Sequence, residues 1–309
     1  MNPRSPDVSI VIVAWNARAY TLECLTSLHR QEPSLAIEII VVDNASTDGT
    51  AEAVTERFPS VRLIRNAKNC GFAKANNQGI QASRGRYLGL VNSDVVLPQQ
   101  CLSHLLAYMD ANPDIGLLGP KMLTPTGDVG CSVMRFPTAW NTFCCALGFS
   151  GFMMKGFSYD RTGDVEVLTG WFWVVRRSAF EKVGGLDEQF FMYGEDIDWS
   201  RRFHNGSWRV VYYANVEALH YGGASSKIAP ARFYIEMRRA NLQYYRKYHG
   251  RLSRVGYWLA VWSHELVRVF AYGSIFIVRH SRRAEASFKI ERSLRCMAWL
   301  TGVRSGHES

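Results

Sequence analysis

Four short runs that are mostly apolar constrain the fold of this chain more than any other feature. They cover residues 8–13, 37–42, 61–64 and 87–91, with Ser9, Glu38 and Arg62 as the polar exceptions. Runs that are apolar at consecutive rather than alternate positions are typical of strands buried on both faces, as in parallel sheets covered by helices. Leu22, Leu25 and Leu28 recur at helical spacing after the first run, and residues 73–83 form a predicted helix before the last. The pattern predicts an α/β fold with a mostly parallel, Rossmann-like central sheet and helices on both faces.

Polar residues follow each of these runs, where the predicted strands end. The four junctions are Trp15–Asn16 and residues 43–46, 66–71 and 92–94. In open parallel sheets a ligand lies outside the carboxyl ends of the strands. One polar junction would be ordinary turn chemistry, whereas four at one edge of the sheet indicate a shared polar ligand. No GxGxxG motif follows any of the runs, which argues against a dinucleotide-dependent dehydrogenase.

An acidic cluster follows an aromatic-rich turn at residues 190–194. Glu195, Asp196 and Asp198 place three carboxylates within four positions. Crowded carboxylates repel one another, so such a cluster usually holds a cation or sets up one carboxylate as a base. The alternative is an acidic first turn of a helix, which the helix dipole favours.

The composition indicates a folded protein of a reducing compartment. Hydrophobic residues make up 47% and charged residues 20% of the 309 positions, as in globular proteins. The seven cysteines are odd in number and form no CxxC pair, which favours buried thiols over a zinc site or a disulfide framework. The first residues show no charged segment followed by an apolar one, so we expect no secretion.

The C-terminal third carries the basic charge of the chain. Residues 227–309 contain 16 Lys and Arg against 5 Asp and Glu, although the net charge of the whole chain is only +9. Aromatic and aliphatic residues accompany this charge, which favours an anionic lipid surface over nucleic acid as the partner.

Two helices are predicted in this third, over residues 231–247 and 255–278. The second is long enough to span a bilayer, but His264, Glu265 and Arg268 fall inside it. We therefore expect it to lie in the membrane interface, with arginines just beyond it facing anionic headgroups. The alternative is a helix docked on its own domain or on a second subunit in a homodimer. The expected apolar surface contains Tyr257, Trp258, Trp262, Phe270 and Phe276.

The chain is predicted to form a nucleotide-binding domain over residues 1–226 and a basic, amphipathic helical region over residues 227–309. Within the first domain, a donor-binding half covers about residues 1–120 and an acceptor half about residues 121–226. Strands are predicted at 170–175 and 208–213, with a helix at 178–183. Residues 140–157 fit a loop, an amphipathic helix or a lid over the acceptor equally well.

Several of these motifs together resemble a family 2 glycosyltransferase of the GT-A fold. They occur in the family's order at residues 8–15, 41–49, 69–73, 92–94 and 194–196, and the resemblance covers about residues 8–225. Residues 190–198 and 220–225 resemble the bacterial rhamnosyltransferase branch of that family. The chain departs from the family's usual Asp-x-Asp at its first position, which is Asn92.

The resemblance implies a donor site, a metal site and a base. Asp94 and His220 are the implied ligands of Mg²⁺ or Mn²⁺, although a strand-end turn residue and a structural histidine are the alternatives. Asp43 is expected to accept a hydrogen bond from the pyrimidine of the donor, unless it only forms an Asx-turn or a helix N-cap. The implied donor-binding residues are Ala14, Trp15, Asn16, Asp43, Asn69, Gly71, Asn76, Asn92 and Ser93.

Asp196 is the implied general base. We expect repulsion from Glu195 and Asp198 to raise its proton affinity, and the aromatic residues around it to desolvate it. Glu195 and Trp171 are the expected acceptor-side contacts, and Trp171 either stacks on a sugar ring or packs in the core. Lys74 and Arg202 either meet phosphate or are solvated surface charges.

The function that follows from the resemblance is inverting, metal-dependent sugar transfer from a nucleotide-diphosphate sugar. The resemblance implies dTDP-rhamnose as the donor and a lipid-linked glycan as the acceptor, with the protein peripheral on the inner, cytoplasmic face of the cell membrane. One alternative is a UDP- or GDP-sugar donor used by the same machinery. Another is a non-catalytic scaffold that binds nucleotide sugars at the membrane.

Overall fold

The computed structural model describes residues 5–138, 140–141, 144, 157–223 and 230–302. The chain separates into two compact units, Met1–Phe136 with Phe157–Ile228 and Pro137–Gly156 with Ala229–Ser309. Most of the irregular stretch at 140–157 lies outside the described residues. The predicted domain limits stay a prediction, and each unit is described by itself below.

A single large sheet forms the centre of the first unit. Its strand order is β3-β2-β1-β4-β10-β6-β11-β5, with β8 beside β11. Strands β1 to β4 are parallel to one another, β11 is parallel to β6, and β10 is antiparallel to both β4 and β6. The strands are β1 (Val8–Ala14), β2 (Ile37–Asp43), β3 (Arg62–Arg65), β4 (Tyr87–Asn92), β5 (Val95–Val96), β6 (Ile115–Leu123), β8 (Gly163–Asp164), β10 (Phe172–Arg176) and β11 (Arg209–His220). A separate two-stranded sheet pairs β7 (Val133–Met134) with β9 (Val167–Leu168).

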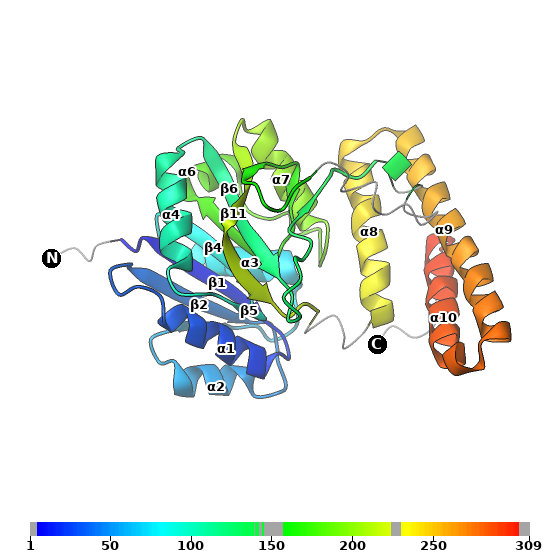
Figure 1. Ribbon diagram of the computed structural model, residues 1–309, viewed down its shortest axis with the longest axis horizontal. Helices are drawn as coiled ribbons and strands as arrows, with labels where there is room; N and C mark the ends of the chain where they lie inside the picture. The colour runs from blue at the N-terminus through cyan, green and yellow to red at the C-terminus, as the bar shows by residue number, and fades with distance from the viewer. Residues whose placement is uncertain (1–4, 139, 142–143, 145–156, 224–229, 303–309) are drawn as a thin grey trace. The chain divides into compact units, whose positions relative to one another are not determined.

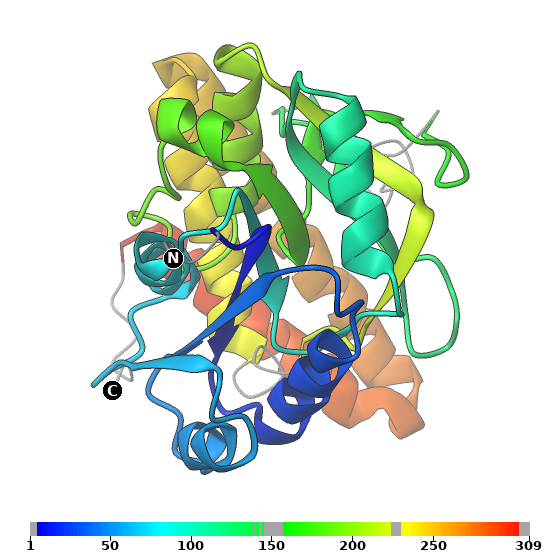
Figure 2. The same ribbon diagram turned by 90° about the vertical axis from the view of Figure 1, so that its left-hand side faces the viewer.

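Helices cover both faces of this sheet (Figures 1 and 2). One face is covered by α1 (Arg18–His29), α2 (Thr50–Arg57) and α4 (Cys101–Ala111), and the other by α3 (Phe72–Ala82), α6 (Arg177–Val183) and α7 (Glu195–Asn205). Strand β1 shows the alternation, because Ile10 and Ile12 enter the core with α1 and α4 while Val11 faces α3. The predicted α/β fold with helices on both faces is therefore confirmed.

Some predicted elements differ from the structure in detail. Strand β3 is an edge strand with exposed ends, so the expectation that all four runs are buried on both faces is wrong for it. Strand β11 runs to His220, well beyond the predicted end at residue 213. Cys24, Cys101 and Cys296 are buried as predicted, whereas Cys131 is exposed.

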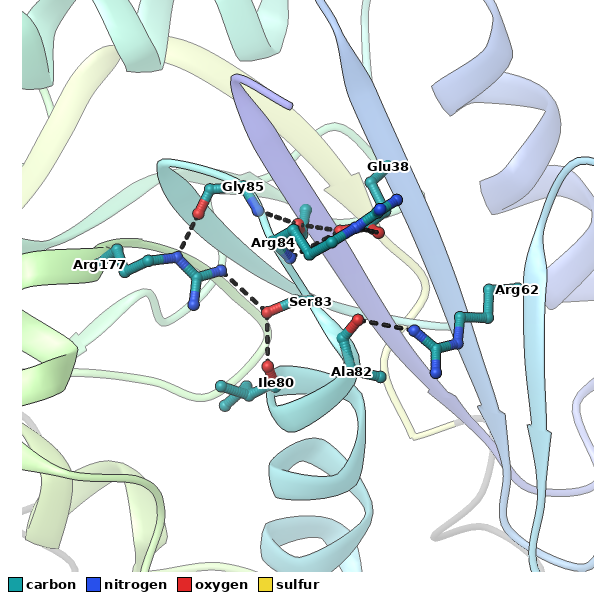
Figure 3. Close-up of polar contacts among 9 residues, drawn as sticks. Glu38, Arg62, Ile80, Ala82, Ser83, Arg84, Gly85 and Arg177 are labelled. Carbon is teal, nitrogen blue, oxygen red and sulfur yellow. Dashed lines mark hydrogen bonds and ion pairs between the residues drawn. The ribbon is translucent and has the colours of Figure 1, made fainter. Parts of the chain in front are cut away.

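A polar network fixes the amino ends of the strands (Figure 3). The Ser9 hydroxyl donates to Glu38 at 2.5 Å and accepts the Gly85 N–H at 2.7 Å. Arg177 donates to the Ser83 hydroxyl at 3.0 Å and to the Gly85 carbonyl. These contacts tie the turn between α3 and β4 to β1, β2 and α6. The polar groups at the amino ends of these strands are therefore bonded to other residues of the chain.

The second unit contains three packed helices, α8 (Pro230–Tyr248), α9 (Arg251–Val278) and α10 (Arg283–Leu300). The predicted helices at 231–247 and 255–278 lie within α8 and α9. Among the helices that the structure describes, α9 alone is long and apolar enough to cross a membrane, as judged by length and composition.

One face of α9 packs inside the second unit, and its other face is exposed. Tyr257 is 1% exposed and stacks on Tyr245 at 4.5 Å, so placing Tyr257 on an exposed apolar surface was wrong. Its ring fills the contact between α8 and α9 instead. Phe270 is 69% and Ile277 72% exposed, which leaves an apolar strip on the outer face of α9.

Candidate active site

The carboxyl ends of β1, β2 and β4 bring three predicted site residues into one row. Ala14 lies opposite Asp43 in the β1–β2 register, and Val13 lies opposite Asn92 in the β1–β4 register. The Asn92 N–H donates to the Trp171 carbonyl at 2.9 Å, which adds the start of β10 to the same edge. Segments far apart in the chain thus meet where an α/β sheet binds its ligand.

The first two junctions hold each other in place. Asn16 has a positive φ of 49° and accepts the Thr47 N–H on its side-chain oxygen at 2.7 Å. Asp43 Oδ2 accepts the N–H of Ser46, three residues on, at 3.3 Å, which differs from the i to i+2 bond of an Asx-turn. The other carboxylate oxygen of Asp43, Oδ1, is buried and has no hydrogen-bond partner in the described structure. An orphaned acceptor at this edge is available to a ligand N–H.

The third junction packs against the segment that precedes the acidic cluster. Gly71 has a φ of +87°, and a Cβ there would lie 2.5 Å from the Phe191 carbonyl oxygen. The Asn69 side-chain oxygen accepts from Asn44 at 2.9 Å and from the Gly71 N–H at 3.0 Å. Buried Asn76 donates to the Phe72 carbonyl at 3.0 Å. The hydrogen bonds of Asn69 and Asn76 hold the loop and the start of α3.

Asp94, His220 and Trp171 form a buried cluster. His220 Nε2 lies 3.1 Å from Asp94 Oδ1, and the imidazole stacks on the Trp171 ring with centroids 5.6 Å apart. The pairing of β5 with β11 places the two segments in register, with His220 opposite Val95. Trp171 is only 3% exposed, so its burial favours the core alternative over an exposed sugar platform. In the described part of the chain no group of three or more His, Cys, Asp or Glu could hold a metal. The candidate protein ligands of a metal are therefore limited to Asp94 and His220.

The acidic cluster forms the first turn of α7, which begins at Glu195 after Gly194 at a φ of 80°. Asp196 is half-buried, and its burial raises the pKa from 3.8 to about 6. Glu195 is 5% exposed with Oε2 unpartnered. Its pKa lies well above the usual range because of burial first and the Asp196 charge second. The three carboxylates therefore do form the acidic first turn of a helix, as the alternative reading predicted. Asp196 in this turn nevertheless has a pKa suited to proton transfer.

Asp198 does not act on Asp196 as predicted. It is fully buried and forms an ion pair with Arg202 Nε at 2.8 Å. Desolvation rather than repulsion dominates the raised pKa of Asp196, whereas the Asp198 charge contributes to the raised pKa of Glu195. Arg202 also donates to the Val183 and Gly185 carbonyls, at 2.9 and 2.7 Å. These contacts make Arg202 a brace between α6 and α7, which differs from both predicted roles.

Two contacts near the site were missed by sequence reasoning. The Gly170 backbone hydrogen-bonds Asp196, and the Tyr221 hydroxyl donates to Glu23 on α1 at 2.9 Å. The glycine stands in the Thr169-Gly170-Trp171 motif, so its small size was a usable signal. The Tyr221 contact joins residues 198 positions apart, and no local pattern announces it.

Comparison with known proteins agrees with this geometry. The family model described as glycosyl transferase family 2 matches residues 9–184, more than half of the chain. The chain belongs to glycosyltransferase family 2. Solved structures support the GT-A fold, and among them the mannosyltransferase PcManGT from Pyrobaculum calidifontis, in complex with GDP-Man and Mn²⁺, has a TM-score of 0.58 and 17% identity. That match covers 96% of this chain and 88% of the other. GalNAc-T7 with UDP, GalNAc and Mn²⁺ gives a TM-score of 0.54 at 15% identity, over 71% of this glycosyltransferase and 44% of the other chain.

A curated relative of this glycosyltransferase carries a rhamnosyltransferase name. It is the N-acetylglucosaminyl-diphospho-decaprenol L-rhamnosyltransferase of Mycobacterium tuberculosis, with 29% identity over 276 residues, 82% of this chain and 88% of the relative. The abequosyltransferase RfbV of Salmonella typhimurium is 32% identical over 134 residues, 41% of this chain and 38% of the relative. The predicted enzyme class and the rhamnosyltransferase-like branch are thereby confirmed.

Proposed function

We propose that this glycosyltransferase moves L-rhamnose from dTDP-rhamnose to a hydroxyl of a lipid-linked glycan. The transfer inverts the configuration at the anomeric carbon and depends on a divalent metal. The name of the mycobacterial relative supports rhamnose as the sugar and a diphospho-lipid as the carrier of the acceptor. The Mn²⁺ and nucleotide sugars in the titles of the structural neighbours support the donor class and the metal.

The Asp94–His220 pair is the observation that carries the proposal. Two atoms that bind one Mg²⁺ or Mn²⁺ side by side, each at about 2.1 Å, lie about 3.0 Å apart. Asp94 Oδ1 and His220 Nε2 lie 3.1 Å apart, which matches that spacing and is also the length of a direct contact between the two side chains, so a shared ion would replace that contact. A bound ion would offset the negative charge that grows on the diphosphate as it leaves. Asn92, in place of a carboxylate, lowers the negative charge of the site by one.

Asp43 is the proposed contact for the nucleotide base. Its Oδ1 is buried and unpartnered, and a pyrimidine such as thymine or uracil offers an N–H to such an acceptor. The Ser46 N–H holds the other oxygen of the carboxylate and thereby orients it. A buried acceptor without a partner is energetically costly, and a ligand N–H that bonds to it offsets that cost. Binding of nucleotides whose base carries such an N–H is therefore favoured.

Asp196 is the proposed base. Its carboxylate takes the proton of the acceptor hydroxyl while the hydroxyl oxygen bonds to the anomeric carbon and the bond from that carbon to the diphosphate oxygen breaks. The displacement inverts the anomeric configuration, and no residue of the chain forms a covalent intermediate. A pKa of about 6 leaves Asp196 ionised at neutral pH and more basic than an ordinary aspartate. Glu195, with its raised pKa, can keep its proton and donate a hydrogen bond to the acceptor.

The outer face of α9 is the proposed contact with the membrane that holds the acceptor. Phe270, Ile277 and Val278 are exposed there, and Arg279 and Arg283 follow. Apolar side chains that enter the acyl boundary, next to cations that meet anionic headgroups, are typical of peripheral membrane helices. This arrangement supports a peripheral location on the cytoplasmic face of the membrane.

A donor panel tests the function. Binding and hydrolysis of dTDP-rhamnose, UDP-glucose, UDP-GlcNAc and GDP-mannose are measured with Mg²⁺, Mn²⁺ or EDTA. We expect dTDP-rhamnose to be preferred and turnover to be lost in EDTA. A preference for a UDP- or GDP-sugar would replace the donor and keep the mechanism. Binding of a donor without turnover on any lipid-linked acceptor would favour the scaffold.

A further inference from the structure

Three arginines, one from each helix of the second unit, surround a single tyrosine ring. The Tyr234 ring of α8 lies 5.1 Å from the Arg238 guanidinium, 6.0 Å from that of Arg268 on α9 and 4.0 Å from that of Arg292 on α10. Cation–π contacts of this kind favour each arginine singly. Three cations around one ring nevertheless repel one another, and that charge needs compensation.

One buried carboxylate supplies only part of the compensation. Glu265 is fully buried, and its Oε1 accepts the Tyr234 hydroxyl at 2.5 Å and Arg238 at 3.3 Å. Arg238 is thereby paired. In the described part of the chain, neither Arg268 nor Arg292 forms a hydrogen bond or an ion pair, and the Nε atoms of both are buried without an acceptor. The cluster therefore carries two positive charges in excess.

Such an arrangement is costly unless an anion completes it. A buried donor without an acceptor loses its bonds to water and gains none in return. Burial and the neighbouring Arg268 charge lower the pKa of the Arg292 guanidinium, which shows the same strain from the electrostatic side. Both arginines are only half-buried, so a small ligand can reach them from solvent. A guanidinium group binds the oxygens of phosphate in a bidentate fashion, and both arginines lie at the same tyrosine ring.

We propose that Arg268 and Arg292 bind a phosphate or diphosphate group at the Tyr234–Glu265 cluster of the helical unit. This site goes beyond the proposed transfer reaction, because none of its residues belongs to the donor or metal site. The group is either a free anion or the headgroup of a phospholipid or of a lipid phosphate. Glu265 and Arg238 orient the tyrosine ring, and the ring in turn supports the two arginines that meet the ligand.

Hydrogen exchange in the full-length protein tests the proposal with a readout located in the helical unit. Peptides from α8, α9 and α10 are followed in EDTA with inorganic pyrophosphate or with dodecyl phosphate below its micellar concentration. We expect at least one of the two to slow exchange in these peptides. The double variant Arg268→Gln/Arg292→Gln should bind at least about tenfold more weakly, because charge-assisted hydrogen bonds are lost. A response to dodecyl phosphate alone identifies a lipid as the source, and a response to pyrophosphate shows that the free group suffices.

Arg295→Gln is the matched control, because Arg295 lies on the same helix, is half exposed and is already paired with Glu291. It should bind like the wild type. If the double variant does not fold, Arg268→Lys/Arg292→Lys keeps the charge and loses the bidentate geometry, and it should also bind more weakly. The proposal is overturned if neither probe slows exchange in these peptides, or if the arginine variants bind as tightly as the wild type. A purely structural role of the cluster would be shown by two results together. The thermal midpoint of Arg292→Met would fall below that of the wild type, and neither probe would change the thermal midpoint of the wild type.

Discussion

Asp196 should separate chemistry from donor binding. Asp196→Asn removes the proposed base and keeps the size of the side chain, so transfer should fall about 10²- to 10⁴-fold. Calorimetric titration with dTDP-rhamnose and Mg²⁺ should give an unchanged dissociation constant, because the residue faces the acceptor in the proposed mechanism. Loss of donor binding would show that Asp196 holds the donor instead. Glu195→Gln mimics a protonated Glu195 and should lose much less activity.

The raised pKa of Asp196 also predicts how activity depends on pH. The base must be ionised to accept a proton, so kcat/KM should fall about tenfold per unit as the pH drops below about 6. A profile measured between pH 4.5 and 8 should show this limb. Activity that stays flat down to about pH 4.5 would contradict a base with this pKa.

Stability should depend on the same group in the opposite direction. Because the fold favours protonated Asp196, its contribution to stability is fully present below the ordinary pKa of 3.8 and is lost as the pH rises through about 6. Asp196→Asn should therefore unfold at a higher urea concentration than the wild type at pH 8, and the difference should vanish near pH 4. A gain that is equal at both values would point to a cause other than ionisation.

At the acidic cluster the residue type alone restricts the chemistry, and the assignment of a base there stays a prediction. Three carboxylates in four positions indicated a base or a cation site, and the structure contains a carboxylate with a raised pKa. The cause was misassigned, because burial and not repulsion is the largest contribution to that pKa. The i and i+4 spacing of the Asp198–Arg202 ion pair was visible in the sequence. The contact of Tyr221 with Glu23 depends on the tertiary fold, and no local pattern encodes it.

At the scale of elements, Gly79 sets the distance between α3 and the sheet. An added Cβ would lie 2.3 Å from Val11 Cγ1, so Gly79→Ala should destabilise the protein by about 1–3 kcal/mol through overpacking. Gly273→Ala in α9 is the matched control, because no atom lies within 4 Å of the new Cβ. It should be neutral or stabilise by up to about 1 kcal/mol. Urea unfolding of both variants measures the difference, and equal effects would exclude packing as the reason.

The strands show why some elements can be predicted and others cannot. Mostly apolar runs identified β1, β2 and β4, because strands buried on both faces favour apolar residues at consecutive positions. The second half of β11 alternates buried Val216 and Ala218 with exposed Asn215 and Glu217, after a register shift. That part lay beyond the predicted strand, which ended at residue 213. The antiparallel direction of β10 could not be predicted either, because an apolar run does not record its orientation.

At the scale of the whole molecule, the exposed face of α9 predicts membrane binding. Phe270→Ser/Ile277→Ser should reduce sedimentation with anionic liposomes by about tenfold or more, because two large side chains no longer enter the lipid. Leu252→Ser, near the other end of the helix and 90% exposed, serves as the control for general loss of apolar surface. It should bind better than the double variant.

Salt separates the lipid from the nucleic-acid alternative. Binding that is carried by buried apolar side chains should persist at high salt, whereas binding to DNA should weaken steeply. Strong DNA binding together with unchanged liposome binding of the Phe270→Ser/Ile277→Ser variant would contradict the membrane proposal. The uneven distribution of charge along the chain was visible in the sequence. Which face of α9 is buried was not, because the partner helix α10 was not among the predicted elements.

The order of strands has a consequence for synthesis on the ribosome. Strand β11 lies between β6 and β5, and β5 joins the sheet only through β11. Asp94 directly precedes β5, so its position depends on a strand that is translated long after it. His220 itself lies beyond residue 184, where the family match ends. A nascent chain that has already folded its first four strands therefore still lacks the proposed metal pair, and on this proposal we expect activity only when nearly all of the first unit has left the ribosome.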